Sequence, residues 1–151
     1  MRRARRRAFA PDPVLLKTSA TILAKEASTA NCTVLVAEDA WLVRLEIVAA
    51  LEDAGFTVRE AESAEDALLI LTELQPEALV TDIRLAGALD GWTLAEAYRR
   101  GHPAGGVIYA SANVPLAERQ VEGRFFFSKP VLMSALVETC RSLCESSDRR
   151  G

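Results

Sequence analysis

The sequence predicts an α/β domain in which a five-stranded parallel β-sheet is covered by helices on both faces. Short, β-branched apolar segments alternate with amphipathic segments from Asn31 onward, the pattern of parallel strands joined by right-handed helical crossovers. The segment Thr33–Ala37 is largely apolar with no period-two alternation, as in a strand buried on both faces. The chain has 151 residues, of which 50% are hydrophobic, enough to form one well-buried core.

The spacing of apolar residues places the individual elements. The expected strands are short and largely apolar, and they cover Thr33–Ala37, Thr57–Ala61, Ala78–Thr81, Gly106–Ala110 and Phe125–Ser128. The expected helices lie between and after them, at Trp41–Ala54, Ser63–Leu74, Gly91–Arg100, a short stretch within Pro115–Glu122, and a last segment from after Pro130 to about Cys144.

The first two helices carry the clearest boundary residues. Gly55 is expected to end the first helix, because glycine readily takes the left-handed backbone that follows many helices. Ser63 and Asp66 have capping-box spacing, and Pro76 stops the second helix. One apolar stripe of the first helix is expected to face the core, formed by Trp41, Leu42, Leu45, Val48, Ala49 and Leu51.

Charge divides the chain into a basic extension and an acidic body. Residues 1–31 hold seven basic and two acidic side chains, whereas the remaining residues hold 11 and 19. We predict an extension over 1–31, partly disordered or forming a short helix, a domain over 32–146 and a polar tail over 147–151. An acidic body argues against nucleic-acid binding, which needs clustered Lys and Arg; binding of the basic extension to anionic membranes or nucleic acid stays an alternative.

Cysteine content and hydropathy favour a reducing, aqueous compartment. The three cysteines, Cys32, Cys140 and Cys144, are too few for a disulfide framework, and packing in the core is the favoured role for the last two. No apolar run approaches the roughly 18 residues of a membrane-spanning helix. We therefore expect a cytoplasmic protein with no membrane span.

Polar side chains follow four of the predicted strands: Glu38 and Asp39, then Asp82, Ser111 and Lys129. Because the carboxyl ends of parallel strands share one edge of the sheet, where ligands bind in such folds, these side chains are expected to converge. Three converging carboxylates repel one another unless a cation lies between them. Oxygen ligands without His or Cys favour Mg²⁺.

The segments that carry these residues resemble the receiver domain of bacterial two-component response regulators. The resemblance covers roughly Thr33 to Cys144 and rests on Val34–Asp39, Leu79–Ile83 and Phe126–Pro130. It implies a flavodoxin-like sheet of strand order 2-1-3-4-5, with a shortened fourth helix because the stretch between Ser111 and Lys129 is shorter than in typical receivers. We expect a stand-alone, single-domain receiver, since few residues follow the last helix.

The resemblance implies a role for each matching residue at the acidic edge. Asp82 would accept a phosphoryl group. Mg²⁺, for which Mn²⁺ could substitute, would be bound by Asp82 and Asp39, by Glu38 through water, and by the backbone carbonyl of Arg84.

Four further positions match the parts of a receiver that contact the phosphoryl group and change conformation. Lys129 and Ser111 would contact the phosphoryl oxygens, and Phe126 would be the aromatic switch residue. The peptide bond between Lys129 and Pro130 is expected to be cis, which proline makes accessible.

The sequence departs from the family pattern beside the acceptor. The loop Arg84–Asp90 lacks the usual Met-Pro pair and contains Gly87, with Gly91 directly after it. Arg84 and Asn113 hold the positions two residues after the acceptor and after the Ser111 hydroxyl, where side chains are expected to modulate the loss of the phosphoryl group.

These observations predict a phosphorylation-dependent signalling module and not an enzyme that turns over a separate substrate. The donor would be a phosphohistidine of a histidine kinase or a histidine phosphotransfer protein, and the effector is an unidentified protein. A monomer or weak dimer is expected. Two alternatives stay open: a phosphatase with an aspartyl nucleophile, which would want an aspartate where Arg84 stands, and a receiver-like docking protein that is never phosphorylated.

Overall fold

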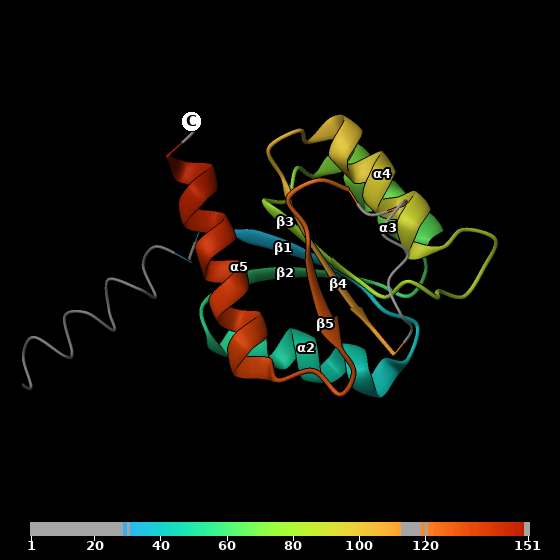
Figure 1. The fold of residues 1–151 in the computed structure, drawn as a ribbon, viewed down its shortest axis with the longest axis horizontal. Coiled ribbons are helices and arrows are strands. Elements are labelled where there is room, and N and C mark those ends of the chain that lie inside the picture. Colours follow the sequence, from blue (N-terminus) through green and yellow to red (C-terminus); the bar gives the residue numbers. More distant parts are fainter. Residues whose placement is uncertain (1–28, 30, 113–118, 120, 150–151) are drawn as a thin grey trace, which may run out of the picture.

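The computed structural model describes residues 29, 31–112, 119 and 121–149, and within them lies a five-stranded parallel sheet (Figure 1). Its strands are β1 (Thr33–Ala37), β2 (Thr57–Ala61), β3 (Ala78–Thr81), β4 (Gly106–Ser111) and β5 (Phe125–Ser128). The strand order is β2-β1-β3-β4-β5, and every neighbouring pair is parallel. The predicted fold class and strand order are therefore confirmed.

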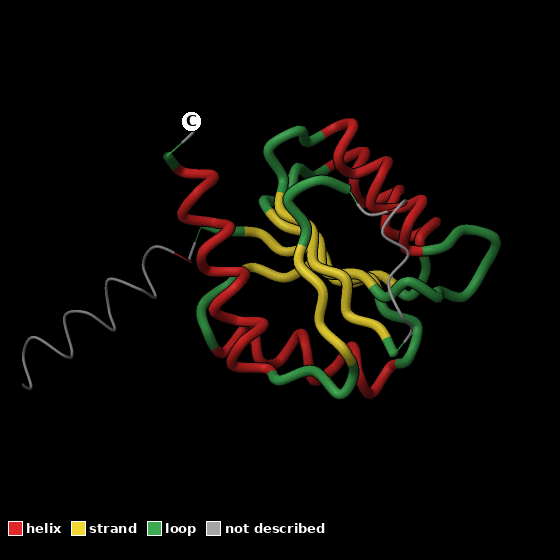
Figure 2. Tube along the Cα trace, in the orientation of Figure 1, coloured by secondary structure: helices red, strands yellow, loops and turns green. Residues whose placement is uncertain are grey.

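Helices cover both faces of the sheet, two on each face in the described part of the chain (Figure 2). Helices α2 (Trp41–Asp53) and α5 (Met133–Asp148) pack on one face, and α3 (Ala64–Glu73) and α4 (Gly91–Gly101) pack on the other. Helix α5 continues past its predicted end at Cys144. No helix among the described residues is both long and apolar enough to cross a membrane.

Two predictions fall largely outside the described residues. The short helix within Pro115–Glu122, and with it the shortened fourth helix, lies mostly on residues 113–118 and 120. Of the basic extension over residues 1–31, the structure describes only Thr29 and Asn31.

The core depends on the three central strands, whose residues are almost wholly buried. Along β1, β3 and β4 nearly every side chain is excluded from solvent, which explains their continuous apolar sequences. The edge strand β2 is more exposed and carries charged side chains, among them Arg59 and Glu60, which discourage pairing with another chain.

Two helix boundaries fall at the predicted residues. Ser63 caps α3 by accepting a hydrogen bond from the Asp66 N–H at 3.1 Å. Gly55, just after α2, has the left-handed backbone expected there, with a φ of 95°.

Helix α2 turns a different face to the sheet than its apolar stripe predicted. Three stripe residues are more than half exposed: Trp41 at 64%, Leu42 at 59% and Leu45 at 55%. The first turns of α2 instead bury Arg44, which donates a hydrogen bond from Nη1 to the carbonyl oxygen of Glu38 at 2.7 Å. The predicted stripe was wrong there because a guanidinium can be buried when the end of a strand supplies an acceptor.

A disulfide joins the beginning of β1 to α5. Cys32, directly before β1, is bonded to Cys144, with a Cα–Cα distance of 6.0 Å and a sequence separation of 112. Both lie in the core between the sheet and the helices α2 and α5, where Cys140 is a free, fully buried thiol. Burial raises the pKa of Cys140 to about 12. This pair corrects the expectation that Cys144 is an unpaired core residue in a chain without disulfides, whereas Cys140 does pack in the core as expected. Spacing along the chain gave no reason to join residues so far apart.

Candidate functional site

Three carboxylates meet where β1 and β3 end. Glu38 and Asp39 follow β1, and Asp82 follows β3, which lies beside β1 in the sheet with Ala37 paired to Thr81. One carboxylate oxygen of each residue lies within 4.8 Å of those of the other two. Glu38 is 1% exposed and Asp82 is 9% exposed, whereas Asp39 is on the surface. The parallel register therefore builds the acidic cluster that the strand ends predicted.

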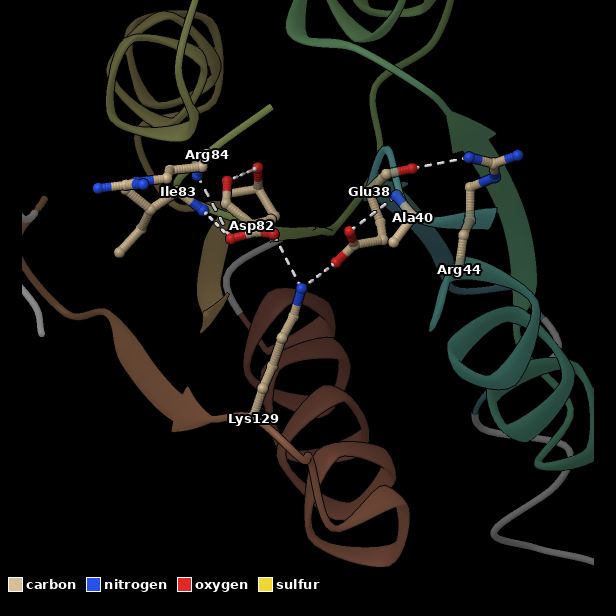
Figure 3. Close-up of polar contacts among 8 residues, drawn as sticks. Glu38, Ala40, Arg44, Asp82, Ile83, Arg84 and Lys129 are labelled. Atoms are coloured by element: carbon tan, nitrogen blue, oxygen red, sulfur yellow. Dashed lines mark hydrogen bonds and ion pairs between the residues drawn. The ribbon is translucent and has the colours of Figure 1, made fainter. Parts of the chain in front are cut away.

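The ammonium group of Lys129 lies between two of these carboxylates (Figure 3). Its Nζ is 2.6 Å from Oε2 of Glu38 and 2.8 Å from Oδ2 of Asp82. Lys129 follows β5, so its side chain extends from the edge of the sheet back toward the ends of β1 and β3. One cation is thus shared between two largely buried anions.

Burial and ion pairing act in opposite directions on the pKa values of this pair. Burial raises the pKa of Glu38 above its ordinary value, and the hydrogen bonds from Lys129 and from the Ala40 N–H only partly offset that effect. Burial by itself would lower the pKa of Lys129, but hydrogen bonds to Asp82 and Glu38 and their negative charges raise it overall. Lys129 therefore stays charged, and the pKa of Glu38 is raised because burial outweighs its hydrogen bonds.

Asp82 is oriented by the backbone that follows it. Its Oδ1 accepts hydrogen bonds from the N–H groups of Ile83 at 2.7 Å and Arg84 at 3.3 Å, while Oδ2 faces Lys129. Helix α4 begins at Gly91, beside this turn. A Cβ on Gly91 would lie 1.8 Å from the carbonyl oxygen of Asp82. Only glycine at that position allows α4 to start so close to the acidic cluster.

The remaining predicted site residues are spread around the same edge. Ser111 ends β4, is 1% exposed, and its carbonyl oxygen accepts a hydrogen bond from the Lys129 N–H. Phe126 lies in β5, partly buried against the core on the α3 and α4 face. The Lys129–Pro130 peptide bond is cis. The side chain of Arg84 is exposed, and Asn113 lies outside the described residues.

Sequence reasoning passed over two residues that hold the loops of this site. Arg44 binds the Glu38 carbonyl and also lies 3.7 Å from Glu60 and 3.5 Å from Glu62. Glu65, in the first turn of α3, accepts hydrogen bonds from two N–H groups of the loop after Asp82. A basic residue at a core-facing position just after the acidic pair could have pointed to Arg44; nothing in the sequence distinguishes Glu65 from an ordinary helix-start carboxylate.

The donor set fits a hard divalent cation. The three side chains offer only carboxylate oxygens, and no His or Cys belongs to this cluster, which matches the ligand preference of Mg²⁺ over that of softer metals. The shared Lys129 ammonium shows that the cluster carries negative charge that needs compensation. Glu38, Asp39 and Asp82 are the residues that would hold such an ion.

The fold and the site together define a doubly wound α/β protein with an acidic, cation-type site at the carboxyl edge of its sheet. The sequence profile of the response regulator receiver domain matches residues 34–141. The chain belongs to this family of two-component signalling domains.

Similar proteins agree with that assignment. The chain is 34% identical over 124 residues to the sensor kinase CckA of Brucella abortus, an alignment that covers 78% of this chain but only 13% of that much longer protein. A response regulator receiver protein from Sinorhizobium medicae has a similar structure, with a TM-score of 0.72, 29% identity, and coverage of 76% of this chain and 94% of that one. The receiver domain of the hybrid histidine kinase CckA gives a TM-score of 0.64 at 27% identity, covering 74% and 98%.

Proposed function

We propose that this chain is a phosphorylation switch in which Asp82 accepts a phosphoryl group from a phosphohistidine of a histidine kinase or histidine phosphotransfer protein. The observation that supports this most directly is the position of the Lys129 ammonium, within 2.8 Å of Asp82 and 2.6 Å of Glu38 in a cluster of three carboxylates. A lysine with this placement can neutralise oxygens of an incoming phosphoryl group beside the acceptor.

The transfer itself needs positioning and charge compensation more than covalent chemistry from the protein. A carboxylate oxygen of Asp82 forms a bond to phosphorus while the bond from phosphorus to the donor imidazole nitrogen breaks, and that nitrogen keeps the electron pair. The hydrogen bonds from Ile83 and Arg84 fix the Asp82 carboxylate before the donor arrives. Lys129 neutralises negative charge on the phosphoryl oxygens.

A magnesium ion held by Glu38, Asp39 and Asp82, with the backbone carbonyl of Arg84, would compensate further charge on the phosphoryl oxygens. Mn²⁺ has similar oxygen-ligand preferences and could substitute. This role is consistent with the all-oxygen donor set of the cluster.

The switch follows from the charge that phosphorylation adds. A phosphoryl group brings about −1.5 to −2 charges to a site where Lys129 already pairs with both Glu38 and Asp82. We propose that the Ser111 hydroxyl moves to donate to a phosphoryl oxygen and that Phe126 follows it inward, which changes the surface read by a partner protein. Attack of water on phosphorus then releases phosphate and regenerates Asp82.

The proposed phosphorylation switch also implies the partners, location and oligomeric state of the domain. The domain would act on no substrate other than its own acyl phosphate, be a monomer or weak dimer, and signal through a protein effector and not through nucleic acid. It would work in the cytoplasm, whose reducing conditions would open the Cys32–Cys144 bond. Asn113, like Arg84, would influence how long the phosphoryl group persists.

Incubation with acetyl phosphate and Mg²⁺, followed by intact mass spectrometry, tests the proposal. We expect the wild type to gain one phosphoryl group, and we expect Asp82→Asn to gain none because the attacking carboxylate is missing. Asp53→Asn, which neutralises an exposed aspartate at the end of α2, is the matched control and should be modified like the wild type. Equal modification of Asp82→Asn and wild type would refute Asp82 as the acceptor.

A further inference from the structure

The loop between Asp82 and α4 is fixed at both its base and its tip. At the base, the Gly91 N–H donates a hydrogen bond to the Ile83 carbonyl oxygen at 2.7 Å. At the tip, the Glu65 Oε1 accepts hydrogen bonds from the N–H groups of Ala88 at 2.9 Å and Leu89 at 3.1 Å. One carboxylate of a neighbouring helix therefore holds the far end of the loop that begins at the acceptor.

The loop is shaped to receive this carboxylate. Ala86 pairs with Ser63 in a parallel bridge just before α3, which brings the loop alongside the start of that helix. Gly87 has a φ of 99°, and a Cβ built on it would lie 2.7 Å from Oε2 and 3.0 Å from Oε1 of Glu65. Gly87 is thus favoured by its positive φ, and a side chain at this position would push the Glu65 carboxylate away from the loop.

Glu65 is committed to this role by its surroundings. The loop N–H groups of Ala88 and Leu89, both bound to Oε1, are the hydrogen-bond partners of this carboxylate from outside its own helix start. The pKa of Glu65 lies below its ordinary value, chiefly because its own backbone N–H donates a hydrogen bond to the carboxylate. Burial acts in the opposite direction, and the hydrogen bonds from Ala88 and Leu89 lower the pKa further. The loop flanks this contact with Leu85 and Leu89, which pack on the core between the sheet and the helices α3 and α4.

We propose that Glu65 is a positioning residue for phosphoryl transfer, holding the loop 83–90 and through it the backbone of Arg84 beside Asp82. The inference rests on the proposed function, in which the Arg84 carbonyl helps to bind Mg²⁺. Glu65 and Arg84 are linked through a short stretch of chain, because Ala86, two residues after Arg84, pairs with Ser63, two residues before Glu65. Release of the tip lets the Arg84 carbonyl sample other orientations, so Mg²⁺ is used less efficiently although Asp82, Asp39 and Lys129 stay in place.

The test is the rate of Asp82 phosphorylation by acetyl phosphate as a function of Mg²⁺ concentration. We expect Glu65→Ala to raise the half-saturating Mg²⁺ concentration by about 10-fold, the scale seen when residues that orient metal ligands are removed, with a smaller change in the maximal rate. Glu65→Gln should restore near wild-type behaviour, because an amide oxygen still accepts both N–H groups. Glu73→Ala removes an exposed carboxylate from the other end of α3 and should change neither parameter.

A second pair of variants separates the contact from backbone strain. Gly87→Ala should reproduce the effect of Glu65→Ala, since its methyl group displaces the carboxylate. Gly123 also has positive φ, 69°, but a Cβ there would meet nothing within 4 Å; Gly123→Ala therefore also places an L side chain at positive φ, without touching Glu65. Amide hydrogen exchange measured by NMR should speed up at Ala88 and Leu89 in Glu65→Ala and in Gly87→Ala, and stay unchanged in Gly123→Ala.

The outcomes distinguish this inference from the function on which it rests. If the wild type is phosphorylated on Asp82 and Glu65→Ala shows the same Mg²⁺ dependence, Glu65 has no positioning role and the proposed function stands. If Glu65→Gln is as impaired as Glu65→Ala, the carboxylate acts by its charge and not as an acceptor for the loop, which also overturns the inference. A wild type that takes up no phosphoryl group defeats the proposed function and the role of Glu65 together.

Discussion

The two ends of the sheet are held together by different kinds of interaction. At the carboxyl end, Glu38, Asp82 and Lys129 form a partly buried set of charges joined by hydrogen bonds of 2.6 and 2.8 Å. At the amino end, the disulfide between Cys32 and Cys144 lies in an apolar core and ties β1 to α5. One end depends on charges that a bound ion or a phosphoryl group can redistribute, and the other depends on covalent and apolar contacts that such a change leaves alone.

Under the proposed function, this difference would let the domain change at its carboxyl end while the amino end keeps its packing. Charge added beside Asp82 acts on nearby ions and loops, because the electrostatic interactions there are only weakly screened in a partly buried site. The core around Cys32 and Cys144 consists of apolar side chains, the disulfide and the Cys140 thiol, whose pKa burial raises to about 12. The three predictions below perturb the two ends separately.

The largest effect is expected at the amino end, from loss of the disulfide. Reduction should lower the free energy of unfolding by about 4 to 5 kcal/mol, because the bond closes a loop of more than 100 residues in the unfolded chain. Urea unfolding with and without reductant measures this change, and the rate of Asp82 phosphorylation should hardly alter.

Thiol counting supplies the control for that experiment. Before reduction the unfolded protein should react with one equivalent of a thiol reagent, from Cys140, and after reduction with three. In the folded protein at pH 8 Cys140 should stay unlabelled, since it is buried and its pKa is about 12. Three reactive thiols in the unreduced, unfolded protein would show that no such bond forms.

An intermediate effect is expected at the carboxyl end, from removal of its cation. Lys129→Met should slow phosphorylation of Asp82 by about 100-fold, equivalent to about 2.7 kcal/mol, because a preorganised charge facing the phosphoryl oxygens is lost. Initial rates from intact mass spectrometry with acetyl phosphate measure it. Lys129→Arg keeps the positive charge and should be less impaired; a Lys129→Met protein that reacts at the wild-type rate would contradict the role of this lysine.

The smallest effect is expected at the rim of the same end, from an exposed side chain. Arg84→Ala should change the lifetime of phosphorylated Asp82 by several-fold, less than the tenfold that 1.4 kcal/mol represents, because Arg84 is exposed and its backbone contacts are preserved. Decay of the phosphorylated protein after removal of acetyl phosphate gives the lifetime. Identical decay in both proteins would rule out a modulating side chain at this position.

Much of the fold was predictable because its strongest patterns are local. Buried parallel strands need continuous apolar sequence, so β1, β3 and β4 were recognisable as segments, and Ser63 and Gly55 marked helix boundaries by their own conformational preferences. The interior face of α2 was mispredicted because hydrophobic spacing cannot show that the Glu38 carbonyl oxygen accepts a hydrogen bond from a buried Arg44. The predicted apolar stripe included Trp41 and Leu42, and both are exposed.

The acidic cluster was predictable for a topological reason, whereas its supporting contacts were not. In a parallel sheet all carboxyl ends lie at one edge, so Glu38, Asp39 and Asp82 were expected together before any distance was known. The sharing of Lys129 between two carboxylates and the attachment of a loop to Glu65 depend on side-chain directions across elements that lie far apart in the sequence.

The sequence alone therefore determined the order of strands and helices, the edge of the sheet at which chemistry gathers, and the kinds of side chain found there. Tertiary structure decided the interaction partners of these side chains. Cys32 bonds to Cys144, Lys129 pairs with both Glu38 and Asp82, and Glu65 binds the loop that follows Asp82. The physical reason is range. Backbone preference and hydrophobic periodicity act within a few residues, whereas hydrogen bonds, ion pairs and disulfides form between any groups that folding brings within a few ångströms.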